Sequence, residues 1–166
     1  MAVKKNIRLL NRHDAAIFRS IRLEAVQDSP LAFAESVAEA NDKSLIDFEN
    51  YLDSHGRGDF VLGDFDGEKL IGVIGFFRSA HRKHFHKGTI WGMYVTPAYR
   101  SRGVGAALFK TRSLTGLRQI NLTVTSGNAA AKRLYEKAGF RVFGIEPAGL
   151  NLEGGYFDEE LMQLLL

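Results

Sequence analysis

The sequence contains no cysteine and no long apolar run, and its positive and negative charges nearly balance. Without cysteine the chain forms no disulfide, carries no thiolate nucleophile and has no cysteine-ligated zinc site. No stretch is apolar for long enough to span a bilayer, and residues 1–6 lack the apolar run of a signal peptide. A formal net charge of +3 is too small to mark nucleic acid as the main partner. We therefore expect a cytoplasmic protein with no membrane partner.

A chain of 166 residues is long enough for one domain with a substantial core. No repeat or low-complexity segment interrupts it, so we expect a single domain over residues 1–166. Apolar periodicity and turn residues predict its elements. They are a strand at 5–10, a helix ending at 28–30, a helix at 44–56, strands at 60–65, 70–77 and 89–95, a helix from 103, a strand at 119–124, a helix at 128–138, and strands at 140–145 and 155–165. This order predicts an α+β fold with a mixed, mostly antiparallel sheet.

The pattern of two helices adds detail to these bounds. In the first, Ile17, Ile21 and Ala25 share one helical stripe with Phe18 beside it. The helix that starts at 103 is short, because residues 115–116 predict a tight turn before the next strand. Residues 31–42 match no pattern, so no element is predicted there.

Residues 95–106 lead from a strand through a proline turn and a glycine-spaced loop into a helix. Such a loop directs backbone N–H groups to one point at the positive end of a helix dipole, which is a site for phosphate. A dinucleotide fingerprint requires a small residue where Leu108 stands, and a Walker loop requires Gly-Lys-Ser/Thr, which the chain lacks. The remaining pattern is Arg-x-x-Gly-x-Gly, which plain helix-entry turns also contain.

Residues 122–145 carry a second pattern, in which a strand and a turn precede a helix that Gly139 closes as a left-handed cap. Asn128 and Tyr135 are two turns apart on this helix, so they share one face, about 10 Å apart along its axis. Asn128 is also a good N-cap before three alanines. The residue types alone are compatible with an ordinary packed helix.

Taken together, the two segments resemble the GNAT superfamily of N-acetyltransferases, with its loop Arg-x-x-Gly-x-Gly and its helix Asn-x-x-Ala-x-x-Leu-Tyr-x-x-x-Gly-Phe. The resemblance implies the GNAT fold, a twisted sheet of about seven strands with about four helices. It also implies an enzyme that moves the acetyl group of acetyl-CoA directly to a primary amine, through a tetrahedral oxyanion, with no metal.

The resemblance assigns roles to single residues. Tyr135 would protonate the leaving thiolate, since a phenol of pKa about 10 keeps its proton at neutral pH and is close to a thiol near 8.5. Asn128 would contact the pantetheine arm. That arm would lie along a strand that splays from its parallel neighbour, and an N–H near Tyr94 or Val95 would polarise the acetyl oxygen. The other coenzyme-binding positions are Met93, Arg100, Ser101, Arg102, Gly103, Val104, Gly105 and Ala106.

The general base and the acceptor are not identified by the motifs. Family members place a glutamate at positions where this chain has Thr89 and Thr123, neither of which can act as a base. Other candidates are Glu35, Glu39, His84, His86 and Glu153, or a chain of water molecules; we assign no base. By its place in the fold, the acceptor pocket would include Phe33, Glu35 and Tyr156, and an acidic, aromatic lining suits a cationic amine.

Two other functions remain open at this stage. The missing glutamates allow a non-catalytic acyl-CoA-binding module on the same fold. A toxin-like aminoacyl-tRNA acetyltransferase is compatible with the basic pI and with the basic segment at residues 81–87, although we interpret that segment as a solvated loop rather than a metal site. Small amines or peptides are the expected partners. The acyl chain and the choice between monomer and homodimer are not determined.

Overall fold

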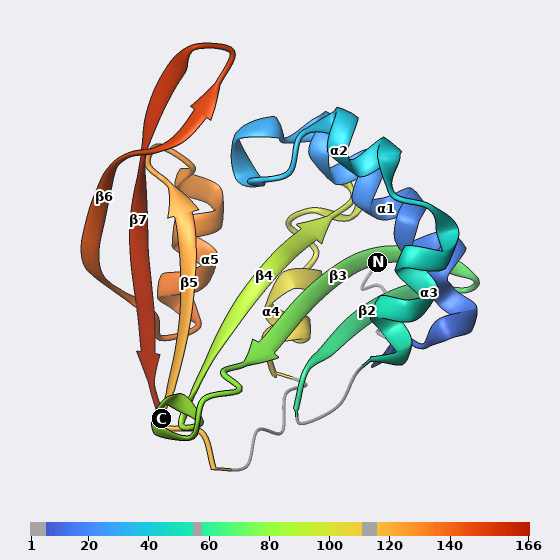
Figure 1. Ribbon diagram of the computed structural model, residues 1–166, viewed down its shortest axis with the longest axis horizontal. Coiled ribbons are helices and arrows are strands. Elements are labelled where there is room, and N and C mark those ends of the chain that lie inside the picture. Colours follow the sequence, from blue (N-terminus) through green and yellow to red (C-terminus); the bar gives the residue numbers. More distant parts are fainter. Residues whose placement is uncertain (1–5, 55–57, 111–115) are drawn as a thin grey trace.

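The computed structural model describes residues 6–54, 58–110 and 116–166. These residues form a seven-stranded sheet in the order β1-β2-β3-β4-β5-β7-β6 (Figure 1). Neighbouring strands are antiparallel except β4 and β5, which are parallel. The strands are β1 (Ile7–Leu9), β2 (Phe60–Asp66), β3 (Lys69–Arg78), β4 (Lys87–Val95), β5 (Gln119–Thr125), β6 (Arg141–Leu152) and β7 (Gly155–Leu165). The predicted α+β class and the mixed, mostly antiparallel sheet are confirmed.

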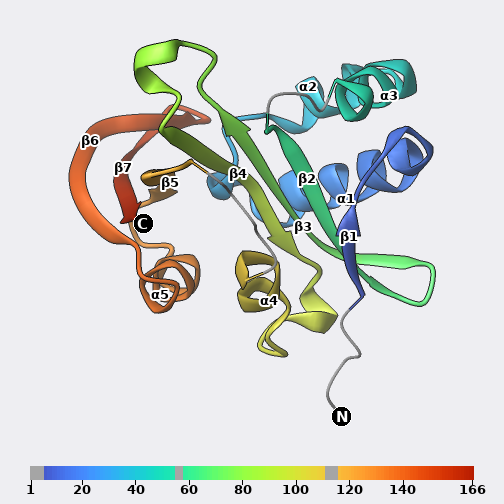
Figure 2. The same cartoon turned by 90° about the horizontal axis from the view of Figure 1, so that it is seen from below.

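Helices cover both faces of the sheet (Figure 2). One face carries α1 (Ala15–Asp28), α2 (Val37–Asp42) and α3 (Leu45–Asp53), and the other carries α4 (Val104–Lys110) and α5 (Ala129–Lys137). Short 3-10 turns lie at Arg12–Asp14 (η1), Pro30–Ala32 (η2), Arg82–His84 (η3) and Pro97–Tyr99 (η4). The described residues thus contain one α-helix more than expected, because the segment without a pattern forms α2.

Each face of the sheet has its own apolar core. On the α1 side Phe18, Phe48 and Tyr94 pack together, and on the α5 side Phe76 and Met162 are almost fully buried. Burial of one such side chain stabilises the fold by about 1.5–3 kcal/mol. The strands β2, β3 and β4 lie between the two cores and present apolar side chains to both.

Local capping explains where the helices on the α1 side begin. The Ser36 and Ser44 side chains accept the backbone N–H groups of Glu39 and Asp47, and both carboxylates reach back to their serines. Such capping boxes stabilise short helices. The predicted stripe of α1 needs correction at Ile17, which is 37% exposed, whereas the other predicted positions are buried. Phe18, and not Ile17, faces the sheet.

Some predicted features lie outside the described residues. They are residue 5 of the 5–10 strand, residues 55–56 of the 44–56 helix and residue 115 of the predicted turn; α3 itself ends at Asp53 with Ser54 as its C-cap. None of the helices within the described ranges is long and apolar enough to cross a membrane.

Candidate functional site

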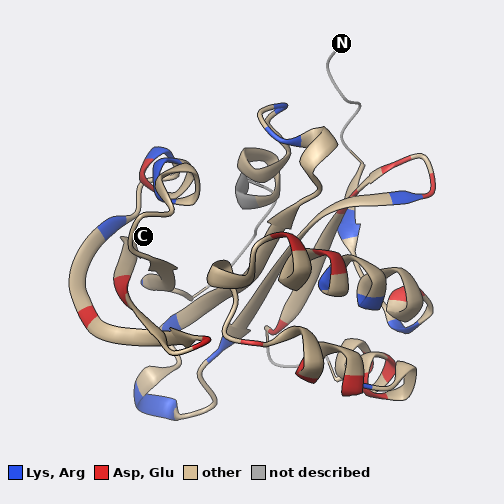
Figure 3. Cartoon of the chain, turned by 90° about the horizontal axis from the view of Figure 1, so that it is seen from above, with Lys and Arg blue, Asp and Glu red and all other residues tan. Residues whose placement is uncertain are grey.

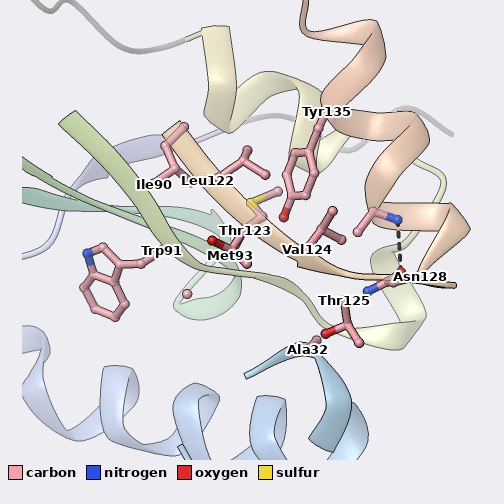
Figure 4. A pocket seen from close by; sticks show the side chains of 12 residues that line it. Ala32, Ile90, Trp91, Met93, Leu122, Thr123, Val124, Thr125, Asn128 and Tyr135 are labelled. Carbon is pink, nitrogen blue, oxygen red and sulfur yellow. Dashed lines mark hydrogen bonds between the residues drawn. The ribbon is translucent and has the colours of Figure 1, made fainter. Parts of the chain in front are cut away.

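The parallel strands β4 and β5 separate along their length, as Figure 1 shows. They pair from Lys87 to Thr89 against Gln119 to Asn121, and beyond that point no register connects them in the described residues. A small cavity of about 80 Å³ lies in the opening, bordered by both strands and by α5 (Figure 4). On this side the backbone of Met93–Val95 has no strand partner. The splay that was expected only from resemblance is therefore present.

A β-bulge shapes β4 at the opening. Val73 and Gly75 of β3 pair with Tyr94 and Trp91, so β4 carries one extra residue between them. Gly92 lies in this bulge with φ of +60°, a conformation that favours glycine. The bulge bends the strand at the point where it leaves its neighbour.

Tyr135 extends from α5 with its hydroxyl pointing into the cavity (Figure 4). The residue is 8% exposed, and its ring packs edge-on against Phe140 at 6.2 Å between centroids. Burial raises the pKa of Tyr135 to about 12. The phenol therefore keeps its proton at neutral pH, but it is a weaker acid than the ordinary phenol on which the expectation of easy proton transfer rested.

Asn128 lines the same cavity and caps α5. Its Oδ1 accepts the backbone N–H of Ala131 at 3.2 Å, drawn as the dashed line in Figure 4. The predicted N-cap is thus confirmed, as is the left-handed Gly139 with φ of +96°. Because the cap uses only the oxygen, the geometry leaves the side-chain nitrogen for a contact with a ligand.

The glycine loop contains two residues with left-handed backbone conformation. Ser101 and Gly103 have φ of +59° and +78°, so the loop turns twice through the left-handed region before α4. The N–H of Ala107 donates to the carbonyl of Gly103 at 3.1 Å, so the amides before it lie in the first turn, whose N–H groups have no intrahelical partner. A Cβ on Gly105 would stand 2.8 Å from the Met93 Cε and 2.9 Å from the Leu134 Cδ2. Glycine at this position lets α4 approach β4 and α5.

The two loop arginines lie differently. Arg100 turns back toward α1, where its Nη2 forms an ion pair with Asp28 and its Nε donates to the Val95 carbonyl at 3.0 Å. The hydrogen bond that Arg100 Nη2 donates to the Asp28 carboxylate lowers the pKa of Asp28. Arg102 lies over the ring of Tyr99, 5.6 Å from its centroid. Arg102 is therefore the better placed of the two to offer its charge to a phosphate.

A second, larger cavity of about 660 Å³ lies on the α1 side of β4. Its walls come from α1, α3 and the strands, and Trp91 borders both cavities. The aromatic side chains in its wall are Phe18, Phe48, Tyr51, Phe77 and Trp91. Carboxylates gather along α2 and α3 on this side of the molecule (Figure 3).

The predicted acceptor residues are not brought together. Glu35 lines the larger cavity, and Phe33 is buried beside it against Tyr94. Tyr156 is 70% exposed on β7, opposite Asn151, away from both cavities. Sequence reasoning missed Arg22, which lies between these regions and is buried. A lone arginine among apolar helix positions is the signal that would have indicated it.

The candidate bases are dispersed as well. Burial by itself raises the pKa of Glu35, but its ion pairs with Lys43 and Arg22 together lower it, so the pKa lies below the usual value. Glu39 caps α2, and Glu153 lies in the β6–β7 turn with φ of +50°. No carboxylate or histidine is among the described residues that line the small cavity, whereas the larger one contains Asp47 and Asp59 besides Glu35.

The basic segment at residues 81–87 lies at the other end of the sheet, near the C-terminus and away from the opening (Figure 1). The rings of His81 and His84 are 6.3 Å apart, and Arg78 stacks on Phe85 with 3.9 Å to the ring centroid. Within the described ranges no three metal-ligating side chains are grouped to hold an ion. This segment is thus remote from the candidate site.

The chain matches a family model described as the acetyltransferase (GNAT) family over residues 23–140. No curated protein is similar enough in sequence to match it. Solved structures with the same fold include a GNAT-family acetyltransferase of Streptococcus pneumoniae, with 23% identity, a TM-score of 0.88, and coverage of 98% of this chain and 100% of that one.

Two other solved structures are similar over nearly the whole chain. Ribosomal-protein-alanine N-acetyltransferase of Brucella melitensis has 21% identity and a TM-score of 0.82, covering 97% of this chain and 99% of its own. The yncA protein of Salmonella typhimurium, solved with its cofactor acetyl-CoA, has 23% identity and a TM-score of 0.80, covering 98% and 94%. At these identities the likeness shows the fold.

Proposed function

The chain belongs to the GNAT family of acetyl-CoA-dependent acetyltransferases, and we propose that it moves the acetyl group directly to a primary amine of a small molecule or peptide, with Tyr135 as general acid. The observation that carries this proposal is the opening between β4 and β5 with the Tyr135 hydroxyl directed into it. A phenol fixed beside a strand edge in a family of acetyltransferases is placed to meet a leaving sulfur.

The residues present fit acetyl-CoA. The unpaired backbone edge at Met93–Val95 can bond to the amides of a pantetheine arm as an added strand would. The left-handed residues Ser101 and Gly103 precede the first turn of α4, whose backbone amides would bind a diphosphate. When bound, acetyl-CoA supplies an activated thioester carbonyl. The remaining chemistry is proton movement and charge stabilisation by the chain.

Tyr135 holds its proton on Oη, and its raised pKa keeps that proton in place at neutral pH. The ordinary pKa of a thiol, about 8.5, is well below the pKa of Tyr135. The hydroxyl would therefore first stabilise the negative charge on the sulfur as a hydrogen-bond donor, and would transfer its proton to the sulfur afterwards. A backbone N–H at the Gly92 bulge or the following residues would stabilise the oxyanion. The amine's proton would leave by water toward the carboxylates of the larger cavity.

Free thiol release from acetyl-CoA with a panel of amines, amino acids, polyamines and short peptides tests the proposal. Tyr135→Phe should lower kcat at least about tenfold, within the range of general acid catalysis, and leave the calorimetric Kd for acetyl-CoA unchanged. Tyr156→Phe is the matched control, because this tyrosine is exposed away from the cavities, and it should not change kcat.

Three outcomes would contradict the proposal in different ways. An unchanged kcat in Tyr135→Phe would remove the tyrosine from the chemistry. Coenzyme binding without thiol release for any acceptor would favour a non-catalytic module. Acetylation confined to aminoacyl-tRNA, with salt-sensitive binding, would favour the toxin-like function.

A further inference from the structure

Arg22 is a buried arginine between α1 and the bulge of β4. Its side chain is 9% exposed, and its Nη2 donates to Glu35 Oε2 at 2.9 Å. Its guanidinium carbon lies 5.0 Å from the ring centroid of Phe33 and 5.5 Å from that of Trp91. The plane of the guanidinium is thereby fixed by one ion pair and two aromatic rings.

The other terminal nitrogen of Arg22 has no hydrogen-bond partner within the described part of the chain. A Cβ built on Gly92 would stand 3.0 Å from this Nη1, so the nitrogen faces the backbone of the bulge. Leaving a buried cationic donor unpaired is costly, so this nitrogen is expected to have a partner that the chain does not supply, such as a water molecule or a ligand. Arg22 also lines the larger cavity.

Arg22, Glu35 and Lys43 form an ion-paired cluster. Glu35 accepts from Arg22 on Oε2 and from Lys43 on Oε1, so one carboxylate faces two cations. These three side chains together carry one net positive charge, and the carboxylates of Asp47 and Asp59 line the same cavity. Arginine binds carboxylates by parallel N–H donors, and Nη1 alone offers two N–H groups.

Building on the acetyl transfer proposed above, we propose that the acceptor is a free α-amino acid with a large apolar side chain, whose carboxylate binds Nη1 of Arg22. Gly92 borders the small cavity beside Nη1, and Trp91 borders both cavities. A carboxylate at Nη1 thus places a nitrogen two bonds away at the mouth of the opening between β4 and β5. The aromatic walls of the 660 Å³ cavity take the side chain.

A free carboxylate distinguishes this acceptor from the N-terminus of a peptide. A peptide offers only a neutral carbonyl at the same position, which leaves the positive charge of the cluster unmatched. Charge-assisted hydrogen bonds are about twice as strong as neutral ones. The structure therefore assigns Arg22 as the residue that selects amino acids over amines and peptides.

The test compares matched acceptors in the thiol-release assay. L-Phenylalanine, L-tryptophan and L-methionine are paired with their decarboxylated amines, their carboxamides and a dipeptide beginning with phenylalanine. Wild type should use the amino acids with a kcat/KM about 10 to 100 times that of the corresponding amines. Arg22→Gln should abolish this preference, because it lowers kcat/KM for the amino acids far more than for the amines.

Two further variants separate recognition from packing. Glu35→Gln disturbs the same ion pair but keeps Arg22, so it should retain a preference for amino acids. Arg22→Lys keeps the charge in case the glutamine variant does not fold, and it should keep part of the preference. A structural role for Arg22 would instead lower kcat/KM for both acceptor classes equally.

The proposal is overturned if wild type uses amines, carboxamides or the dipeptide as well as the amino acids, or if Arg22→Gln lowers all classes alike. Calorimetry with L-phenylalanine and its N-acetyl product decides the case in which no acceptor releases thiol. Binding that Arg22→Gln weakens at least tenfold would support the carboxylate site and contradict acetyl transfer. Absence of binding would overturn the carboxylate site.

Discussion

Trp91 and Met93 are two residues apart on β4, yet their side chains pack on opposite faces of the sheet. Trp91 packs with the core under α1, and Met93 packs with the core under α5. In a regular strand residues i and i+2 share a face, so the extra residue Gly92 causes the change. One strand thereby borders both the larger cavity and the small cavity.

Gly92→Ala tests whether the bulge and Arg22 are coupled. Gly92 has φ of +60°, and its new Cβ would meet Arg22 Nη1 at 3.0 Å. The left-handed conformation alone costs about 1–2 kcal/mol for alanine. Gly67→Ala is the control, because Gly67 has the same φ of +60° and no atom within 4 Å of the added Cβ. Urea unfolding should show a larger loss of stability at Gly92, and equal losses would contradict the contact.

Arg100 and Arg102 should respond differently to truncation. Arg100→Ala breaks the ion pair with Asp28. Because the Arg100 side chain is 45% exposed and the Asp28 side chain 28% exposed, the loss should lower the free energy of unfolding by only about 1 kcal/mol. Arg102→Ala should leave stability unchanged and weaken acetyl-CoA binding, less so at high salt. Calorimetry and thermal unfolding of both variants check this. A larger loss of acetyl-CoA affinity in Arg100→Ala than in Arg102→Ala would contradict this assignment and indicate that Arg100 contacts the phosphates.

Asn128 has two proposed roles that one pair of variants separates. Asn128→Ala removes the cap of α5 and should cost about 1 kcal/mol of stability. Asn128→Asp keeps an oxygen to cap Ala131 but removes the side-chain N–H groups. Both variants should weaken acetyl-CoA binding if the nitrogen contacts the pantetheine arm. Normal affinity in Asn128→Asp would leave only the cap.

The raised pKa of Tyr135 predicts an alkaline loss of stability. Its native pKa is about 12, whereas an unfolded tyrosine ionises near 10. Between these values the unfolded chain loses the proton first, so stability falls as pH rises, by roughly 1 kcal/mol at pH 11. Tyr135→Phe should remove this contribution to the loss of unfolding free energy between pH 9 and pH 11, as measured by urea unfolding. The same slope in wild type and variant would contradict the burial of the hydroxyl.

Local patterns predicted the elements whose cause is local. The helix at Ala129–Lys137 was expected because Asn128 caps it and Gly139 ends it, and both act through their own backbone neighbours. The last strand, Gly155–Leu165, was expected at its observed bounds. The family motifs indicated the fold because each of them is a short local pattern that can be recognised in the sequence.

The site depends on contacts between distant segments, which no local pattern contains. Arg22 meets Gly92 across 70 residues, and the Thr125 hydroxyl bonds the Leu31 carbonyl across 94. The helix α2 was missed although Ser36 and Glu39 form a capping box, because six residues are too few for a periodic signal. The tertiary environment of Tyr135 likewise determines its pKa, which its sequence neighbours do not reveal.

The most direct test of acetyl transfer follows the acetyl group itself. Acetyl-CoA labelled with ¹³C in the acetyl group is incubated with the chain and each acceptor, and the products are analysed by mass spectrometry and NMR. The account predicts one labelled acetyl group on the amine nitrogen of the acceptor, in equal amount to the free thiol, with formation slowed at least about tenfold by Tyr135→Phe. Label recovered only as free acetate, or as intact acetyl-CoA with every acceptor, would contradict it.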